Sequence, residues 1–334
     1  MKPPEVAVLG AGGFLGLNTV RAFLDAGIKP RCGRRPRGNV LGLRGLGAPL
    51  VVTDFTQPET LREAFRGVDV VVHAAAHYPR FSTEPQETIA RGLKELETVL
   101  DAAVAAHVRR LVFVSSTATV APRDAAPSTE GDVFSGCPDW GTYHALKWNL
   151  EHRLRDEGRL EVVVACPAAC LGPYDWKVGT SALLVATVRG VPPPHPKGRI
   201  TTVDARDVGQ ALVLMATADA PPERLILANE AFDAHELLVM LAARYGAPPP
   251  PAALEPDAAR ELADAQEHEA QKTGGRAALA RELVDLIVHS PRLDASRSRN
   301  FGLTYRPLSD TLDAWDSWAM RMGLLQRPRP EKSA

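Results

Sequence analysis

The chain has 334 residues, 45% of them apolar and 24% charged, and a formal net charge of −1 at pH 7. This balance gives no electrostatic reason to expect a nucleic acid or a membrane surface as a partner. No run of about 18 apolar residues occurs, and the first residues lack the apolar region of a signal peptide. The cysteines fit neither a zinc spacing nor a disulfide framework. We therefore expect a cytoplasmic protein without a metal site; its cysteines are Cys32, Cys137, Cys166 and Cys170.

Short apolar runs alternate with segments of helical spacing through the first half of the chain. Continuous β-branched runs are typical of strands that helices cover on both faces, and this alternation implies right-handed βαβ units. The sequence predicts an α/β fold with a doubly wound parallel (Rossmann) sheet and a smaller, partly helical lobe. We place a dinucleotide-binding domain at 1–168 and a mainly substrate-binding lobe at 169–330, some segments of which can return to the sheet. The expected strands are 6–9, 30–33, 50–53, 69–73, 111–114 and 162–165, and the expected helices are 15–24, 58–65, 84–106, 141–157 and one or two within 254–290.

The first expected strand ends in a glycine-rich turn, GAGGFLG, at residues 10–16. In a dinucleotide-binding turn, Gly10 permits the tight bend, Gly13 lets the backbone approach a pyrophosphate, and Gly16 lets the helix pack on the sheet. The start of that helix offers free N–H groups to the phosphates. The alternative is a plain glycine turn. The strand before it and the helix after it favour a cofactor, which we expect to contact Gly10, Gly13, Phe14, Leu15 and Gly16.

Basic residues follow the second expected strand. A glycine turn of this kind usually precedes, by about 20 residues, a carboxylate that holds the ribose hydroxyls. Here that place is taken by RCGRR at 31–35. Guanidinium groups match phosphate geometry, so Arg34 and Arg35 favour NADP(H) through its 2′-phosphate, with NAD as the less favoured cofactor. The alternative is a solvated basic loop.

Two further strand ends are expected to contact the cofactor. Asp54 and Phe55 follow the third strand, where Asp54 can accept a hydrogen bond from the adenine amine. Alternatively, Asp54 or Thr56 caps the helix that begins at Pro58. For His73, at the end of the fourth strand, a buried structural histidine is the preferred interpretation. The small residues after it leave room for the cofactor; they are Ala74, Ala75 and Ala76.

Tyr143 and Lys147 are separated by one helical turn and so share a face of the expected helix. We expect the Lys147 ammonium to lower the pKa of the Tyr143 phenol from its usual value of about 10. Such a phenol can exchange a proton with a carbonyl or alcohol oxygen while hydride moves. Upstream, a strand ends in SST at 115–117, where a hydroxyl would polarise the same carbonyl. The alternatives are a chance spacing and a loop cap by the serines.

These motifs resemble those of the extended short-chain dehydrogenase/reductases, also called the NAD-dependent epimerase/dehydratase family. The resemblance covers about residues 5–245 and the stretch from about 292, whereas 250–290 has no counterpart. It implies a catalytic triad of Ser116, Tyr143 and Lys147, with Thr117 as the alternative hydroxyl. It also implies a homodimer through helices 84–106 and 141–157, and cofactor contacts by Ser115 and Pro167.

Within the family, GPYDWK at 172–177 is similar to the dihydroflavonol-reductase-like and hopanoid-associated, epimerase-like branch. Aromatic residues near the expected cleft favour an apolar or aromatic small-molecule substrate, although several of them can equally belong to the core. We expect an NADP(H)-dependent reductase of a ketone or aldehyde. The alternatives are a sugar epimerase or dehydratase that retains its cofactor, and a non-catalytic dinucleotide sensor. The expected substrate-binding residues are His77, Tyr78, Trp140, Cys170, Tyr174 and Trp176, with Phe81 nearby.

Overall fold

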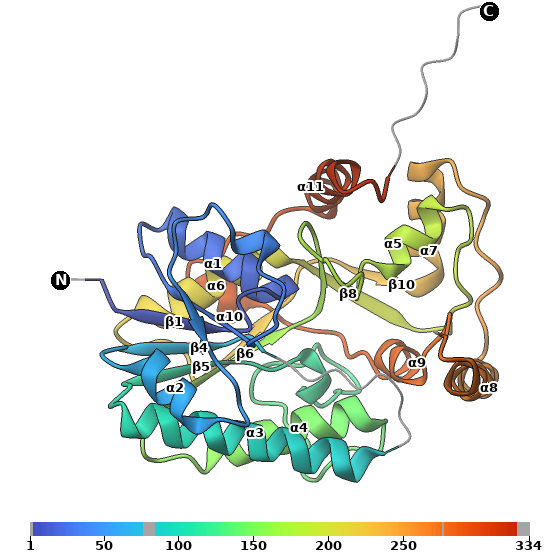
Figure 1. Cartoon of the computed structure of the whole chain (residues 1–334). Helices are drawn as coiled ribbons and strands as arrows, with labels where there is room; N and C mark the ends of the chain where they lie inside the picture. Colours follow the sequence, from blue (N-terminus) through green and yellow to red (C-terminus); the bar gives the residue numbers. More distant parts are fainter. Residues whose placement is uncertain (1–2, 76–83, 276, 326–334) are drawn as a thin grey trace, which may run out of the picture.

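A parallel β-sheet forms the centre of the molecule (Figure 1). The computed structural model describes residues 3–75, 84–275 and 277–325. Within these residues seven strands pair, all in parallel. Their order confirms the predicted doubly wound arrangement. Across the sheet it is β3 (Leu50–Val52), β2 (Arg31–Arg34), β1 (Val6–Leu9), β4 (Val70–His73), β5 (Arg110–Val114), β6 (Glu161–Pro167) and β9 (Arg224–Leu227).

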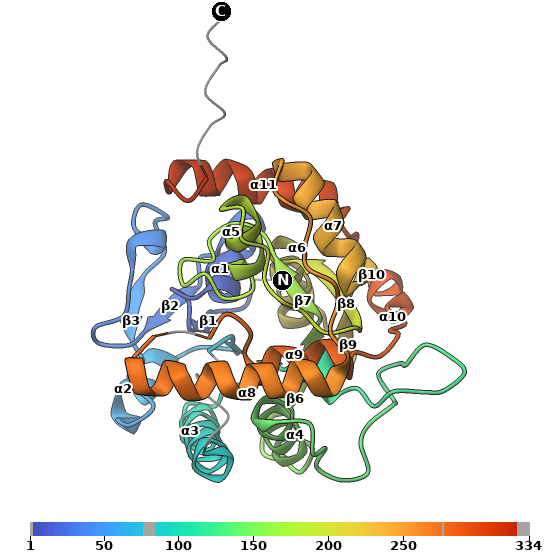
Figure 2. The same cartoon turned by 90° about the vertical axis from the view of Figure 1, so that its right-hand side faces the viewer.

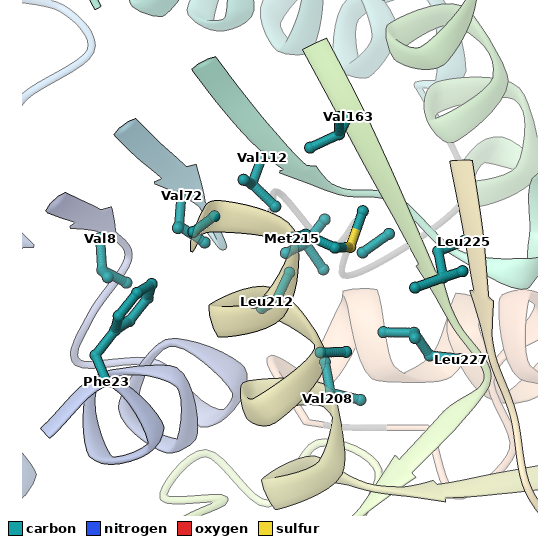
Figure 3. Close-up of a cluster of buried hydrophobic side chains, with 14 of the residues drawn as sticks. Val8, Phe23, Val72, Val112, Val163, Val208, Leu212, Met215, Leu225 and Leu227 are labelled. Carbon is teal, nitrogen blue, oxygen red and sulfur yellow. The ribbon is translucent and has the colours of Figure 1, made fainter. Parts of the chain in front are cut away.

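Helices cover both faces of this sheet (Figures 1 and 2). Side chains alternate along each strand, so Val6 and Val8 of β1 join one core while Ala7 and Leu9 join the other. Figure 3 shows the first core, where valines of the central strands meet Phe23 and residues 208–215. The helices on that face are α1 (Phe14–Asp25) and α6 (Ala205–Thr217), and those on the opposite face are α2 (Pro58–Phe65), α3 (Pro85–Ala105) and α4 (Thr142–Arg155).

The second half of the chain completes the sheet, because it supplies both β9 and α6. Arg110 of β5 ties these parts together although its side chain is fully buried. Its guanidinium donates to the carbonyl oxygens of Met215 at 2.9 Å and Ala218 at 2.7 Å, and its Nε donates to Glu161 at 2.7 Å. Segments of the C-terminal half therefore return to the Rossmann unit.

The remaining C-terminal residues build a lobe beside the carboxyl edge of the sheet (Figure 1). It contains a three-stranded sheet and a separate core that includes the fully buried Trp315. The strands are β10 (Ala231–Asp233), β8 (Arg199–Asp204) and β7 (Ala169–Leu171), and the helices around this core are α5 (Ala182–Val188), α7 (Ala234–Tyr245) and α11 (Leu308–Arg321). A shorter helix, α10 (Ser296–Asn300), packs near β9.

The segment without a family counterpart forms two helices, in agreement with the one or two that its composition predicted, and these pack as a helical hairpin. Its helices are α8 (Pro256–Thr273) and α9 (Arg281–Val288). They share a small core of Ala259, Ala263, Leu279 and Val284. Both views place α9 near one end of α4 (Figures 1 and 2), so the hairpin reaches the helix that carries Tyr143 and Lys147.

Candidate active site

The glycine turn lies between β1 and α1, at the carboxyl edge of the sheet. Gly10 has φ +74°, and a Cβ on it would lie 2.7 Å from the Cα of Ala75. A Cβ on Gly16 would lie 2.1 Å from the carbonyl oxygen of Gly10. Gly13 is the N-cap of α1 and offers no side-chain hydrogen bond, so no cap side chain competes for the first N–H groups of α1. Phe14 and Leu15 pack against the core. This cradle suits a pyrophosphate.

The two arginines lie at the end of β2 and in the loop that follows. Arg34 is half-buried, and its Nη1 donates to the carbonyl oxygens of Pro36 at 2.8 Å and Arg35 at 3.3 Å. Arg35 is exposed. Its charge helps to lower the pKa of Asp54. The cationic groups therefore stand near the expected adenosine end of the site.

Asp54 closes a local turn. Its Oδ1 accepts from the Thr56 hydroxyl at 2.7 Å and the Thr56 amide at 3.0 Å, and these bonds hold the pKa of the carboxyl below its ordinary value. The expected capping of α2 by Asp54 or Thr56 is wrong. The N-cap is Gln57, which makes no side-chain cap bond, because the Asp54 carboxylate is used by the turn before the helix.

His73 fills the space between two aromatic rings. Its ring centroid is 5.6 Å from those of Phe55 and Phe113. Burial, with a smaller effect of the Lys147 charge, lowers the pKa of His73 to about 3. This neutral, buried ring agrees with the structural interpretation. Ala74 and Ala75 follow it half-buried at the sheet edge, whereas Ala76, His77, Tyr78 and Phe81 lie outside the described residues.

Ser116, Tyr143 and Lys147 meet where β5 ends beside α4. Ser116 lies close enough to the phenol to lower its pKa through a side-chain interaction, and its hydroxyl accepts from the Ala118 amide at 3.2 Å. The Lys147 Nζ donates to the Val114 carbonyl at 3.0 Å and lies 5.9 Å from the centroid of the Tyr143 ring. The loop-cap role and the triad arrangement therefore coexist at Ser116.

The expected direction of the Tyr143 shift is wrong for this arrangement. Burial raises the pKa of Tyr143 to about 12, and the side-chain interaction with Ser116 offsets only part of that effect. Burial also lowers the pKa of Lys147 to about 8. The lysine donates to a backbone carbonyl and not to the phenol. The effect of burial on the Tyr143 pKa therefore outweighs the attraction to the Lys147 charge that the helical spacing led us to expect.

A buried carboxylate on the same helix face escaped the sequence analysis. Glu151 lies one turn after Lys147 and is 2% exposed. It accepts hydrogen bonds from the hydroxyls of Ser115 at 2.8 Å and Thr119 at 2.7 Å, and it pairs with Arg224 of β9 at 2.7 Å. The Ser115 hydroxyl is thus occupied by a hydrogen bond to the buried Glu151 carboxylate. The i, i+4, i+8 spacing of 143, 147 and 151 was the available signal.

The start of α4 receives a second carboxylate that no local pattern indicates. Glu282 of α9 accepts from the backbone amides of Thr142 and Tyr143, each at 2.9 Å. About 140 residues separate these partners along the chain, as the two bonds span 140 and 139 positions. Only the folded arrangement of the α8–α9 hairpin brings them together.

The expected substrate residues divide into two groups. Cys170 is buried beside Tyr143, whose pKa it helps to raise. Trp140 stacks on His289, with ring centroids 4.2 Å apart. On another side of the lobe, Arg21 lies over the Tyr174 ring at 4.3 Å, and Trp318 meets Trp176 edge-on with centroids 5.7 Å apart.

Tyr174 and Trp176 therefore serve the packing between α1 and α11, which is the core interpretation left open by the sequence. Pro167 is buried at the end of β6, in register with Leu227 of β9. In the part of the chain that the structure describes, no group of three or more His, Cys, Asp or Glu side chains is arranged to hold a metal ion. No helix among the same residues is both long and apolar enough to cross a membrane.

Comparisons with known proteins agree with this geometry. Residues 6–228 match the model of the NAD dependent epimerase/dehydratase family. The chain is 30% identical to sterol demethylase protein B of Methylococcus capsulatus over 254 residues, which cover 75% of this chain and 77% of that protein. It is 25% identical to a putative dihydroflavonol 4-reductase of Synechocystis over 252 residues, or 73% of each chain. A nucleoside-diphosphate-sugar epimerase from Pseudomonas aeruginosa has the same fold, with a TM-score of 0.78, 24% identity, and coverage of 97% of this chain and 99% of that one.

Proposed function

The chain belongs to the NAD-dependent epimerase/dehydratase family, and from this premise we propose that it is an NADP(H)-dependent reductase of a ketone or aldehyde. The observation that carries the proposal is the meeting of Ser116, Tyr143 and Lys147 at the carboxyl edge of the sheet, beside a glycine turn that suits a dinucleotide. Reductase chemistry needs a proton donor and a polarising hydroxyl near the cofactor, and this edge of the sheet supplies both.

The residues present fit a dinucleotide. A Cβ on Gly10 or Gly16 would collide with the backbone of Ala75 or of Gly10, so these glycines let the turn close tightly. The turn leads into the start of α1, which presents its N-terminal N–H groups to a phosphate there. Arg34 and Arg35 would hold a 2′-phosphate, and Lys147 would hold the nicotinamide ribose. When bound, the nicotinamide supplies the hydride for the reaction.

The chain's own side chains would handle the proton and the developing negative charge. Ser116 would donate a hydrogen bond to the substrate oxygen, and Tyr143 would give that oxygen its proton. The phenol carries its proton at neutral pH, as an unperturbed tyrosine also would. Burial raises its pKa to about 12, which makes the phenol a weaker acid, so the proposal rests on the position of Tyr143 and not on this shift.

The substrate is proposed to be apolar or aromatic. Cys170 borders the phenol and Trp140 lies just before α4, with its ring on His289. The names of two relatives, a sterol demethylase protein and a putative dihydroflavonol reductase, suggest a polycyclic or aromatic carbonyl compound. A panel of sterol ketones, flavanones and aryl aldehydes covers these chemistries.

The test follows NADPH oxidation at 340 nm across this panel. Tyr143→Phe keeps the ring and removes the proton, so turnover should fall by about 10²–10⁴-fold while NADPH binding by calorimetry is retained. Ser116→Ala should cost about 10²–10³-fold. Turnover that survives in Tyr143→Phe would remove the tyrosine from the mechanism.

A retained-cofactor epimerase or dehydratase is the second candidate, since the matched family model carries that description. Such an enzyme recycles its hydride and needs no external supply. Acid extraction of the purified protein distinguishes the two: stoichiometric NAD(P) that persists through gel filtration favours the second candidate, and an empty protein that oxidises added NADPH favours the reductase.

We further propose a homodimer through α3 and α4, which lie side by side on one face of the molecule (Figure 1). Sedimentation velocity should then give a mass of twice the 36.0 kDa of one chain. A species at the mass of one chain over the micromolar range would exclude this assembly.

A further inference from the structure

The first turn of α4 is capped by a side chain from another helix. Glu282 accepts from the Thr142 amide through Oε1 and from the Tyr143 amide through Oε2, each at 2.9 Å. The N-cap of α4 is Gly141, which has no side chain to accept these bonds. A carboxylate at this position satisfies two N–H groups that the helix leaves unpaired and also complements its dipole.

The chain leaves space for this carboxylate at Gly141. Gly141 has φ +103°, and a Cβ there would lie 3.1 Å from Glu282 Oε2 and 3.3 Å from Asp285 Oδ2. Glycine is therefore favoured at this position for two reasons. Its backbone conformation is one that other residues rarely adopt, and a side chain would crowd the Glu282 and Asp285 carboxylates.

Glu282 is itself held in a fixed place, with only 2% of its surface exposed. The start of α9 is capped by Glu267 of α8, which accepts from the Arg281 amide at 2.7 Å. Its far end places His289 against Trp140, just before Gly141. The neighbouring Asp285 is neutralised by Arg260 and Arg281, each at 3.0 Å. The hairpin thus presents a rigid carboxylate to α4.

We propose that Glu282 is a positioning residue for Tyr143, fixing the first turn of α4 so that the phenol faces Ser116 and placing a negative charge near that phenol. This inference rests on the proposed function, in which Tyr143 is the proton donor. It assigns a role to 250–290, the part of the chain for which the sequence offered none.

The charge has a defined direction of effect. Among the residues that the structure describes, those that face Tyr143 include Ser116, Cys166, Cys170, Lys147 on its own helix, and Glu282. Burial raises the pKa of the phenol most, and the charges of Cys170, Glu282 and Cys166 raise it further. A positioning carboxylate here keeps the phenol protonated to higher pH. Its removal should shift the titration of Tyr143 downward.

The positioning role is tested by amide hydrogen exchange, which needs neither substrate nor cofactor. Glu282→Ala removes both acceptors, so the amides of 142 and 143 should exchange at least about 10-fold faster. Glu282→Gln keeps one oxygen acceptor and should give an intermediate rate. The matched control is Glu261→Gln, which removes an exposed carboxylate of α8 and leaves the caps of α9 and α4 in place. Unchanged exchange in Glu282→Ala, or an equal increase in Glu261→Gln, would overturn the proposal.

The charge is tested by NMR of tyrosine labelled with ¹³C at Cζ, recorded between pH 8 and pH 11.5. Because the pKa of Tyr143 is about 12, the onset of its ionisation within this range is compared between variants. The Tyr143 signal is assigned by its loss in Tyr143→Phe. In Glu282→Gln the phenol should titrate at a lower pH, by about a few tenths of a pH unit, and in Glu261→Gln it should titrate as in the unaltered chain. An unmoved titration in Glu282→Gln would contradict the proposed charge effect.

The outcome is separable from that of the proposed function. If exchange and titration respond as expected and no carbonyl compound is reduced, Glu282 still positions Tyr143 and the reductase assignment fails. If reduction depends on Tyr143 and neither readout responds to Glu282, the reductase assignment stands and this inference fails.

Discussion

Arg34 and Arg35 differ in how much of their hydrogen-bonding capacity is still available. One Nη of Arg34 is used by two carbonyl oxygens of its own loop, which orients the guanidinium, while Arg35 is exposed. A guanidinium has five N–H donors, so the loop bonds of Arg34 are compatible with a phosphate on its other edge. A 2′-phosphate would therefore be bound by one guanidinium whose orientation is fixed by its own loop and by a neighbouring one that is exposed.

We expect Arg34→Ala/Arg35→Ala to weaken NADP(H) binding by about 10- to 100-fold for each charge-assisted bond lost, or roughly 1.5–3 kcal/mol apiece. Affinity for NAD(H), which lacks the 2′-phosphate, should hardly change. Calorimetric titration of both cofactors measures this, and Arg37→Ala, which removes a nearby exposed charge, is the control. Equal or tighter binding of NAD(H) by the unaltered protein would contradict the preference.

That Ser116, Tyr143 and Lys147 lie together was predictable because their signals are local. The spacing of Tyr143 and Lys147 and the strand-end Ser116 can be found in single short segments. The direction of the Tyr143 pKa shift was not predictable, since it depends on burial, and burial is a property of the whole fold. The packing of Trp176 against Trp318 likewise joins distant segments.

At the scale of elements, α4 links the site to the rest of the sheet. Its inward face carries Tyr143, Lys147 and Glu151, and Glu151 connects the loop after β5 to Arg224 on the edge strand β9. Arg224 in turn donates to the Glu130 carbonyl at 2.8 Å. The helix was predictable from its periodicity, and the helical spacing places Glu151 on its inward face, but the partners Arg224 and Glu282 come from segments far away in the chain.

Glu151→Ala should destabilise the chain by about 3–5 kcal/mol, because it leaves the buried Arg224 without its counter-charge. Urea unfolding followed by circular dichroism gives the free energy of unfolding. The control is Glu63→Ala, which removes an exposed ion pair with Arg66 and should cost less than about 1 kcal/mol. A similar small loss for Glu151→Ala would show that its network contributes little.

At the scale of the molecule, two buried neutral histidines make the stability of the fold depend on pH on the acid side. Burial lowers the pKa of His73 to about 3 and that of His144 to about 4. For each, the folded-state value lies below the usual value of about 6.5. Their contribution to stability is therefore present above pH 6.5 and is lost as the pH falls toward those lower values.

For His73 the loss between pH 7.5 and pH 5 should be roughly 2 kcal/mol. His73→Gln, which cannot take up a proton, should show a correspondingly smaller fall in the free energy of unfolding over that interval. Chemical unfolding of both proteins at the two pH values is the measurement. Parallel losses in the two proteins would mean that His73 already ionises in the folded state.

The doubly wound parallel sheet, with helices on both faces, was predictable from the alternation of short apolar runs with helices. The boundary at 168 was the weaker part of the domain prediction. Nothing in residues 205–227 marks them as part of the first unit, yet α6 and β9 complete it. Whether a strand such as β9 joins the edge of the sheet depends on its pairing with β6, which lies far away in the chain.

The buried Arg110 has a consequence for synthesis on the ribosome. Its carbonyl partners, among them Met215 and Ala218, are translated more than 100 residues after it, since those bonds span 105 and 108 positions. Until they emerge, a growing chain would have to keep this guanidinium hydrated, and the centre of the sheet could not close around it. The sheet can therefore form fully only after residues near 218 have been synthesised. A gene truncated after the first 168 codons should yield a product that does not fold stably and that chaperones bind and proteases degrade.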